Sequence, residues 1–290
     1  MSGCCRDSKN NNQLNTTKLP PMRKNVLLLS LCQALMNSGN ALLGTTSALV
    51  GQHLATNKSL ATLPLALQFL TTMFTSIPAS MLMKHIGRKA GFIVGTLLGL
   101  TGAGLAAWAI IHASFIYFCV GAALFGGFNG FGTYYRFAAA DIAPDDYRSR
   151  AISYVMAGGV IAAFVGPNLA SWTSGWLQSA EFAGSYVALV GIYAASLFVL
   201  LFLDIPRPLQ HESHDRGRPL RVIAAQDTFI VAVLGSMLGY GMMVLVMTAT
   251  PLAMHAYAFH DTAFVIQWHV LGMFAPSLYY RSPYPTLWRA

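Results

Sequence analysis

Charged side chains are scarce in this chain of 290 residues. Asp, Glu, Lys and Arg make up 10% of it, whereas hydrophobic residues make up 55% and the mean hydropathy is +0.52. A soluble domain usually carries about 25% charged residues. A soluble core cannot hide so much apolar surface, so the composition predicts that lipid is the solvent for most of the chain.

Several motifs of catalysis and metal binding are also missing. The sequence contains no HExxH segment and no P-loop of the form GxxxxGK[ST], which disfavours an ATP-driven pump. The four cysteines show no CxxC spacing, so we expect free thiols, no metal and no cofactor. The acidic cluster of Asp141, Asp145 and Asp146 has no partner motif, which leaves a polytopic membrane enzyme as a remote alternative.

Long apolar runs are what the chain has instead. A helix needs about 20 apolar residues to cross a bilayer. We therefore predict an all-α, polytopic membrane helix bundle. The predicted spans are 26–51, 61–83, 91–111, 115–139, 151–175, 185–203, 228–252 and 263–280.

Basic residues lie mostly on one side of this predicted topology. Most of the 18 Lys and Arg residues fall in the N-terminal tail and in the loops after the second, fourth and sixth spans, whereas the opposite loops contain Lys58 alone. Positive loops stay in the cytoplasm during insertion. The pattern predicts a cytoplasmic N-terminus in a bacterial inner membrane. It also explains the formal charge of +8 without a nucleic-acid partner.

The runs also divide the chain into units. Residues 1–25 are polar and lack the apolar core of a secretory signal, so we expect a cytoplasmic tail. Six spans follow in 26–203, and the arginine- and proline-rich stretch 204–226 is long for a loop and predicts a cytoplasmic linker. The segment 227–280 holds two more spans, and 281–290 is an atypical tail.

Polar side chains recur at helical spacing inside several spans. Residues three, four or seven positions apart share one face of a helix, and polar groups facing lipid are costly. We predict that they line a central cavity for a small-molecule solute, although the spacing alone also allows hydrogen bonds between neighbouring helices. The candidates are Gln33, Asn37, Asn40, Gln68, Asn129, Thr133, Arg136 and Tyr240.

Ionisable groups within the spans are few. No Asp or Glu lies in the middle of the first six spans, so a carboxylate proton relay there is poorly supported. Among the histidines, His269 is the best candidate for a titrating group, with a structural role favoured. Arg136 lies near the cytoplasmic end of its span, where it can reach water, pair with Asp141 or meet an anionic substrate.

Three short motifs occur in a fixed order along the first six spans. They are "MKHIGRKAG" after the second span, "DIAPDDYRSRA" after the fourth and "AGGVIAAFVGP" within the fifth. In this order they resemble the motifs of the major facilitator superfamily (MFS), although Lys84 stands where the first motif has an acid. The matching positions are Gly87, Arg88 and Lys89, then Asp141, Arg148 and Arg150, and finally Gly166 and Pro167.

This resemblance carries expectations about fold and function. It implies a cytoplasmic latch at the first two motifs, a gate helix at the third, and a secondary transporter that moves a small organic solute by alternating access. It also implies twelve spans in two six-helix halves, of which eight are present. The alternative is therefore a truncated remnant that does not transport.

Overall fold

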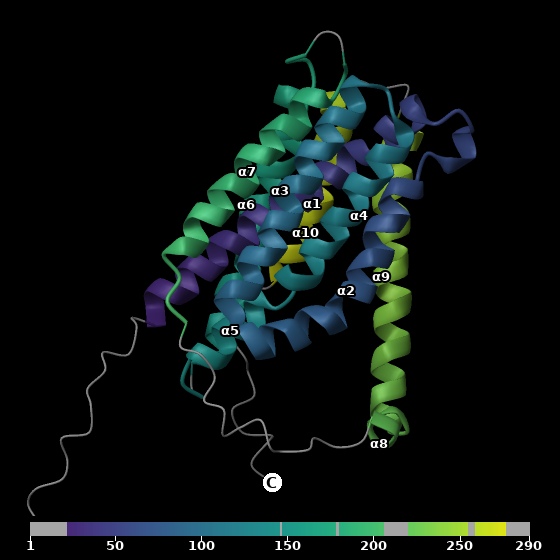
Figure 1. Cartoon of the computed structure of the whole chain (residues 1–290). Coiled ribbons are helices and arrows are strands. Elements are labelled where there is room, and N and C mark those ends of the chain that lie inside the picture. The colour runs from purple at the N-terminus through teal and green to yellow at the C-terminus, as the bar shows by residue number, and fades with distance from the viewer. Residues whose placement is uncertain (1–21, 146, 178–179, 206–219, 255–258, 277–290) are drawn as a thin grey trace, which may run out of the picture.

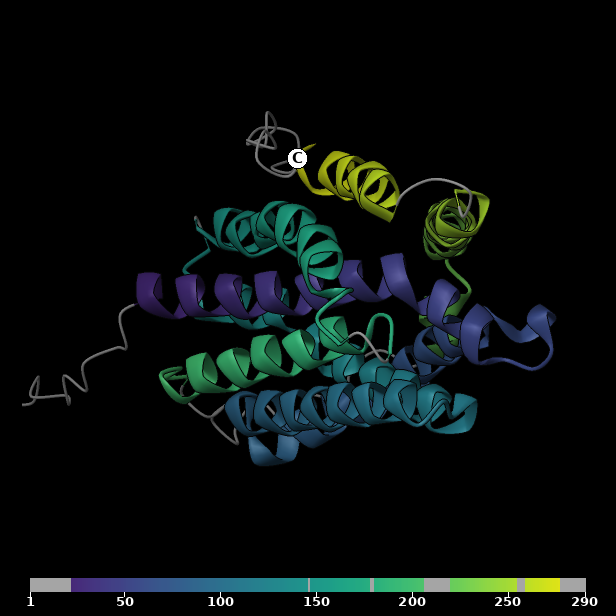
Figure 2. The same cartoon turned by 90° about the horizontal axis from the view of Figure 1, so that it is seen from above.

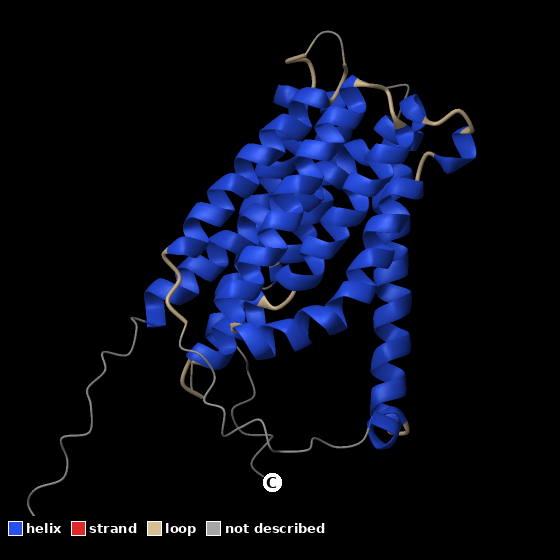
Figure 3. Cartoon of the chain, viewed as in Figure 1, coloured by secondary structure: helices blue, strands red, loops and turns tan. Residues whose placement is uncertain are grey.

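The computed structural model describes residues 22–145, 147–177, 180–205, 220–254 and 259–276, and all regular structure within these ranges is helical (Figure 3). The predicted all-α bundle is therefore confirmed. The elements in chain order are α1 (Met22–Leu54), η1 (Lys58–Leu60), α2 (Leu63–Ile86), α3 (Arg88–Ile111), α4 (Phe115–Gly132), α5 (Tyr135–Ile142), α6 (Arg148–Thr173), α7 (Ala183–Leu201), α8 (Leu220–Ala224), α9 (Asp227–Ala253) and α10 (Phe259–Phe274).

Within the described ranges, seven helical segments are long and apolar enough to cross a bilayer, counting α4 and α5 as one. The eighth predicted span corresponds to α10, which has 16 residues, and the part of that span beyond residue 276 lies outside the description. The connections alternate between the two ends of the bundle, with α5 and α8 at the same lower end in Figure 1. Residues 206–219 of the predicted linker and the tail 281–290 also lie outside the described ranges.

The fourth predicted span is not one helix. The sequence predicted a continuous run over 115–139, but α4 ends at Gly132 and α5 starts at Tyr135. Thr133 turns its hydroxyl back to the carbonyl of Gly130 at 3.0 Å, and the hydroxyl of Tyr134 donates to the carbonyl of Ser76 at 2.9 Å. The local bond of Thr133 competes with regular helical bonding, and the bond of Tyr134 ties the break to α2.

Helix α1 runs through the middle of the six-helix unit (Figures 1 and 2), where it packs along α6 and α7. Small residues allow close contacts. A Cβ atom at Gly166 of α6 would lie 2.6 Å from the backbone carbonyl oxygen of Ser38 in α1. Aromatic rings also pack between helices, where Phe128 of α4 lies edge-on against Tyr193 of α7 with ring centroids 4.9 Å apart.

Large apolar side chains also cover the outside of the bundle. Ile77, Ile116 and Trp172 are each 70% exposed or more. Such a surface would aggregate in water but is suited to acyl chains. The lipid bilayer is therefore the natural partner of this surface.

The last two described helices attach on one side of the bundle (Figure 2). Helix α10 packs on α6 and α1 through a small cluster of Ala41, Ala163, Ile266 and Val270. Helix α9 contacts α1 and α10, and Pro251 is its one fully buried residue among those described. The wall that α9 forms is therefore held far less tightly than the walls formed by α1, α2 and α4.

Candidate functional site: a central cavity

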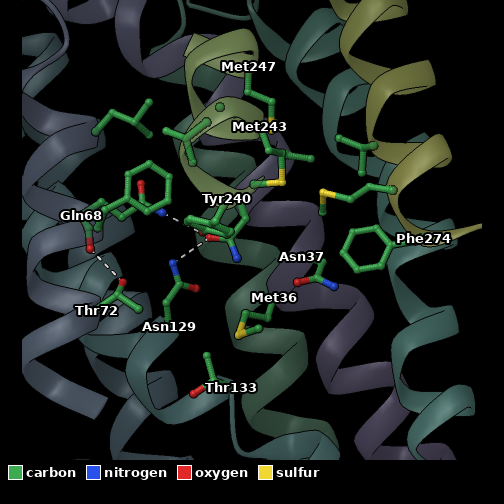
Figure 4. A pocket seen from close by; sticks show the side chains of 18 of the residues that line it. Met36, Asn37, Gln68, Thr72, Asn129, Thr133, Tyr240, Met243, Met247 and Phe274 are labelled. Carbon is green, nitrogen blue, oxygen red and sulfur yellow. Dashed lines mark hydrogen bonds between the residues drawn. The ribbon is translucent and has the colours of Figure 1, made fainter. Parts of the chain in front are cut away.

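A cavity of about 330 Å³ lies between α1, α2, the α4–α5 break, α6, α9 and α10 (Figure 4). This volume falls at the lower end of the range of small-molecule sites, roughly 300–1,000 Å³. The side chains of all eight candidates lie on its wall. These are Gln33, Asn37, Asn40, Gln68, Asn129, Thr133, Arg136 and Tyr240.

Side-chain amides from three helices meet on one wall of the cavity. Asn40 of α1 accepts two hydrogen bonds at its Oδ1 atom, from Gln68 Nε2 of α2 at 3.3 Å and from Asn129 Nδ2 of α4 at 2.9 Å (Figure 4). One helical turn away, Gln33 Nε2 donates to Asn37 Oδ1 at 3.1 Å. The helical spacing of these residues thus brings them onto the cavity wall and also links them to one another.

Several polar atoms of this wall have no partner. Asn37 Nδ2, Gln68 Oε1 and Asn129 Oδ1 are shielded from water and make no hydrogen bond, and the same holds for Thr248 Oγ1 on α9. A buried polar atom left unpaired costs roughly 1–3 kcal/mol. Unpaired groups gathered around one cavity are suited to a ligand that supplies the missing partners.

The rest of the cavity wall is largely apolar and rich in sulfur. The ring of Tyr240 on α9 meets the ring of Phe69 on α2 edge-on, with centroids 6.0 Å apart. The spacing of polar residues gave no reason to select Phe69 or the methionines of other helices, because such residues are usual in any membrane helix. The methionines of this wall and its neighbours are Met36, Met156, Met243, Met247 and Met273.

Arg136 is the one charged residue among the described residues that line the cavity. Its guanidinium carbon lies 4.9 Å from the centre of the Phe137 ring, a cation–π contact. The pairing of Arg136 with Asp141 that the sequence allowed is not formed. Asp141 pairs instead with Arg88.

The first motif forms the turn between α2 and α3. Gly87 ends α2 with φ 90° and ψ 157°, a conformation that side chains other than hydrogen disfavour. Arg88 then reaches Asp141 at the end of α5, and Lys89 Nζ donates to the carbonyl of Leu201 at the end of α7, 2.9 Å away. The predicted latch residues therefore join three segments, although the latch function stays a prediction.

The other motif residues are less connected. Arg148 pairs with Asp145 at 3.0 Å, but both side chains are mostly exposed, and Arg150 is exposed in the first turn of α6. Gly166 and Pro167 lie buried in α6, which continues through them as a helix. Their role as a gate stays a prediction.

Metal binding finds no support in the described part of the chain. No group of three His, Cys, Asp or Glu side chains gathers there. His269 lies on α10 with its Nε2 atom buried and unpaired, and it does not line the cavity. Asp146 of the acidic cluster lies outside the description.

Known proteins resemble this chain over most of its length. The riboflavin transporter RfnT of Brucella anthropi is 39% identical over 261 residues, which cover 89% of this chain and 66% of that protein. An uncharacterized MFS-type transporter of Bacillus subtilis, YddS, is 25% identical over 251 residues, covering 80% of this chain and 57% of that protein. The chain thus spans about two thirds or less of the length of these curated relatives.

The crystal structure of an autoinhibited peptide transporter of the POT family is similar to this chain at 16% sequence identity. The alignment covers 89% of this chain and 55% of the peptide transporter chain. The TM-score of this alignment is 0.47. The sequence profile of the Major Facilitator Superfamily, by contrast, matches residues 29–279, which is most of the chain. Together with the helical bundle, this match shows that the chain belongs to the Major Facilitator Superfamily.

Proposed function

We propose that the chain binds and transports riboflavin or a closely related flat, neutral heterocycle. The observation that carries the proposal is the mixed lining of the cavity, in which amides on α1, α2 and α4 lie beside Phe69 of α2, Tyr240 of α9 and methionines of α1, α6, α9 and α10. Flat apolar rings pack well against aromatic and sulfur-containing side chains, and amides hydrogen-bond polar ring atoms without net charge. The 39% identity to a protein named as a riboflavin transporter supports the same solute.

The chemistry of the cavity disfavours charged alternatives. Among its described lining residues there is no carboxylate, so a cationic solute would lack a counter-ion while Arg136 repelled it. An anionic group is compatible with the end of the cavity near Arg136 but would face apolar side chains elsewhere. We therefore assign the eight lining candidates to solute binding.

We infer alternating access as the mechanism, with the N-terminus in the cytoplasm of a bacterial inner membrane. The basic loops favour this orientation. In it, the ion pair of Arg88 with Asp141 and the bond of Lys89 to α7 lie on the cytoplasmic side and would have to open and close during transport. The break at Thr133 gives the helix that holds Asn129 a place to bend.

A second candidate function is solute binding without transport. Helix α9 has a single fully buried described residue, so most of its apolar surface lacks a protein partner. A bundle with one loosely held wall can bind a solute and still fail to exchange it across the membrane. This candidate corresponds to the remnant interpretation of the sequence.

Uptake and binding together separate these candidates. Radiolabelled riboflavin uptake is measured in riboflavin-auxotrophic bacteria that express the 290-residue chain, and binding is measured on purified protein in lipid nanodiscs by quenching of flavin fluorescence. The variant Asn37→Ala should lower both signals by about fivefold or more, because it removes a buried donor and leaves Gln33 unpaired. Thr101→Ala, on the exposed face of α3, is the control and should leave both unchanged.

Uptake together with binding supports the transporter, and binding without uptake supports the second candidate. If neither flavin binding nor flavin uptake responds to expression of the chain, riboflavin is the wrong solute. If Asn37→Ala behaves like the control, the cavity is the wrong site.

A further inference from the structure

We propose that the amide cluster of Asn37, Asn40, Gln68 and Asn129 recognises the edge of a planar ring that carries a ring N–H beside a ring carbonyl, as in a cyclic imide, ureide or lactam. The inference rests on the proposed function, because it assigns the solute to the same cavity. It goes further by naming the part of the solute that the protein reads and the residues that read it.

The hydrogen bonds within the amide cluster show which of its atoms are already paired. Asn40 Oδ1 accepts from both Gln68 and Asn129, so its two lone pairs are occupied by protein donors. Each of those two amides therefore turns its carbonyl oxygen away from Asn40. Three amides, from helices α1, α2 and α4, thus meet at Asn40 Oδ1.

Three atoms of the amide cluster have no hydrogen-bond partner. Gln68 Oε1 and Asn129 Oδ1 are acceptors without a donor, and Asn37 Nδ2 is a donor without an acceptor. Gln68 and Asn37 are only 3% and 8% exposed, so the surrounding protein covers most of each side chain. A small rotation of each side chain brings its free atom to a solute in the cavity, and the solute then removes the cost of leaving it unpaired.

The set of free atoms selects the chemistry of the solute. Two free acceptors require N–H or O–H donors, and the free donor requires a carbonyl or similar oxygen. A carboxylate offers acceptors only, and an ammonium group offers donors only and carries a charge that the cavity does not balance. A neutral ring edge with N–H and C=O groups side by side satisfies both kinds of atom.

A polyol also offers donors and acceptors, but the rest of the cavity favours the ring. Phe69 and Tyr240 present aromatic surface to the same cavity, and Met243 and Met247 also line it. A flat ring buries its faces against these side chains while its edge meets the amides. A polyol would place hydroxyl groups against the same apolar wall without partners.

The test removes one N–H from the probe. Lumiflavin carries the flavin ring without the ribityl chain, and its N3-methyl derivative lacks the ring N–H between the two carbonyls. Binding of both is measured by fluorescence quenching on the full chain in nanodiscs. Loss of one buried hydrogen bond predicts that N3-methylation weakens binding by roughly 5- to 100-fold. A ribitol competitor tests the polyol reading.

Variants show whether the cluster is responsible. Asn129→Ala removes one free acceptor, so the wild-type preference for lumiflavin over the N3-methyl compound should largely disappear. Asn168→Ala is the matched control, because Asn168 Nδ2 also bonds an amide, Gln267 Oε1 at 2.7 Å, but lies between α6 and α10 away from the cavity wall. That control should keep the preference even if it lowers stability.

Each result of these binding experiments either supports or overturns the inference. Equal binding of lumiflavin and its N3-methyl derivative overturns the inference but leaves riboflavin transport standing, and displacement of lumiflavin by ribitol does the same. If neither lumiflavin nor riboflavin binds, uracil, hypoxanthine and their N-methyl derivatives are tested by thermal stabilisation. Stabilisation that depends on the ring N–H then supports the inference while riboflavin is rejected, and no such stabilisation overturns both.

Discussion

The contact between α2 and α4 sets the position of Gln68, and one glycine controls that contact. A Cβ atom at Gly126 would collide with the side chain of Thr71 and with the backbone carbonyl of Gln68. At the next residue, a Cβ atom on Gly127 would meet only Leu98 Cδ1 at 3.4 Å, an ordinary contact. The pair Gly126→Ala and Gly127→Ala therefore compares a clash with its absence at adjacent positions of one buried helix.

The magnitude follows from two opposing terms. Replacing glycine by alanine inside a helix is favourable by about 1 kcal/mol, and this term is shared by both variants. Overpacking costs about 1–3 kcal/mol, and because a backbone carbonyl cannot rotate away, it falls on Gly126→Ala alone. The difference between the two variants is then the clash itself, about 1–3 kcal/mol in the free energy of unfolding.

The assay uses buried thiols as reporters of unfolding. Cys32 and Cys119 are free and buried, so they react with a thiol-sensitive dye once the bundle opens, and Cys4 and Cys5 are replaced by serine to remove background. Each kcal/mol corresponds to roughly 2–4 °C in the midpoint for a chain of this order of size. We therefore expect the melting midpoint of Gly126→Ala to lie below that of Gly127→Ala, by the shift that about 1–3 kcal/mol corresponds to.

The same pair tests the link to the cavity. Moving α2 away from α4 stretches the bond of Gln68 to Asn40, so Gly126→Ala should also weaken solute binding while Gly127→Ala does not. Equal midpoints for the two variants, or a lower one for Gly127→Ala, would refute the packing argument. Equal binding despite different midpoints would show that the amide cluster tolerates movement of α2.

Three further predictions concern the end of the bundle where α1 begins and α7 ends. The fully buried Asn25 holds the backbone of Asp204 through two hydrogen bonds, of 2.6 and 3.2 Å, so Asn25→Ala should lower stability by about 1–3 kcal/mol. Asn25→Asp should lower it at least as much, because it sets a buried carboxylate oxygen against the carbonyl oxygen of Asp204. The side chains of Arg88 and Asp141 are 25% and 59% exposed, so a double-mutant cycle should give a coupling under about 1 kcal/mol; a value above 2 would mean that the pair is desolvated in lipid. Gly87→Ala places a Cβ atom at φ 90° and should cost about 1–3 kcal/mol; an unchanged melting midpoint would contradict that conformation.

The arrangement of the cavity wall was partly predictable because helical spacing is a local property. Asn37 and Asn40 are three residues apart, so any helix through them places both on one face, and lipid makes the inward orientation favourable. The same reasoning applies to Asn129 and Thr133 on the fourth span. Sequence reasoning thus selected side chains that the structure gathers around one cavity, without specifying their mutual bonds.

The mutual bonds were not predictable because they join residues far apart in the chain. Asn40 and Asn129 are 89 positions apart, and Arg88 and Asp141 are 53 apart. Which acid meets which base depends on how the helices are packed, and periodicity contains no information about that. The break after Gly132 escaped prediction for a related reason, since the bond from Tyr134 to the backbone of α2 exists only in the folded bundle.

The two walls of the cavity differ in how firmly they are held, and this difference bears on specificity. The amides lie on helices that pack against each other through backbone contacts, so their positions are fixed, as a hydrogen-bonding site requires. The methionines of α9 lie on a helix with little buried surface, and methionine adapts its shape at low cost. The firm wall is thus suited to reading the polar edge of a solute, and the loose wall to accommodating variation in its apolar body. If the proposed site is correct, we expect strict selection at the polar edge of the solute and tolerance at its apolar body.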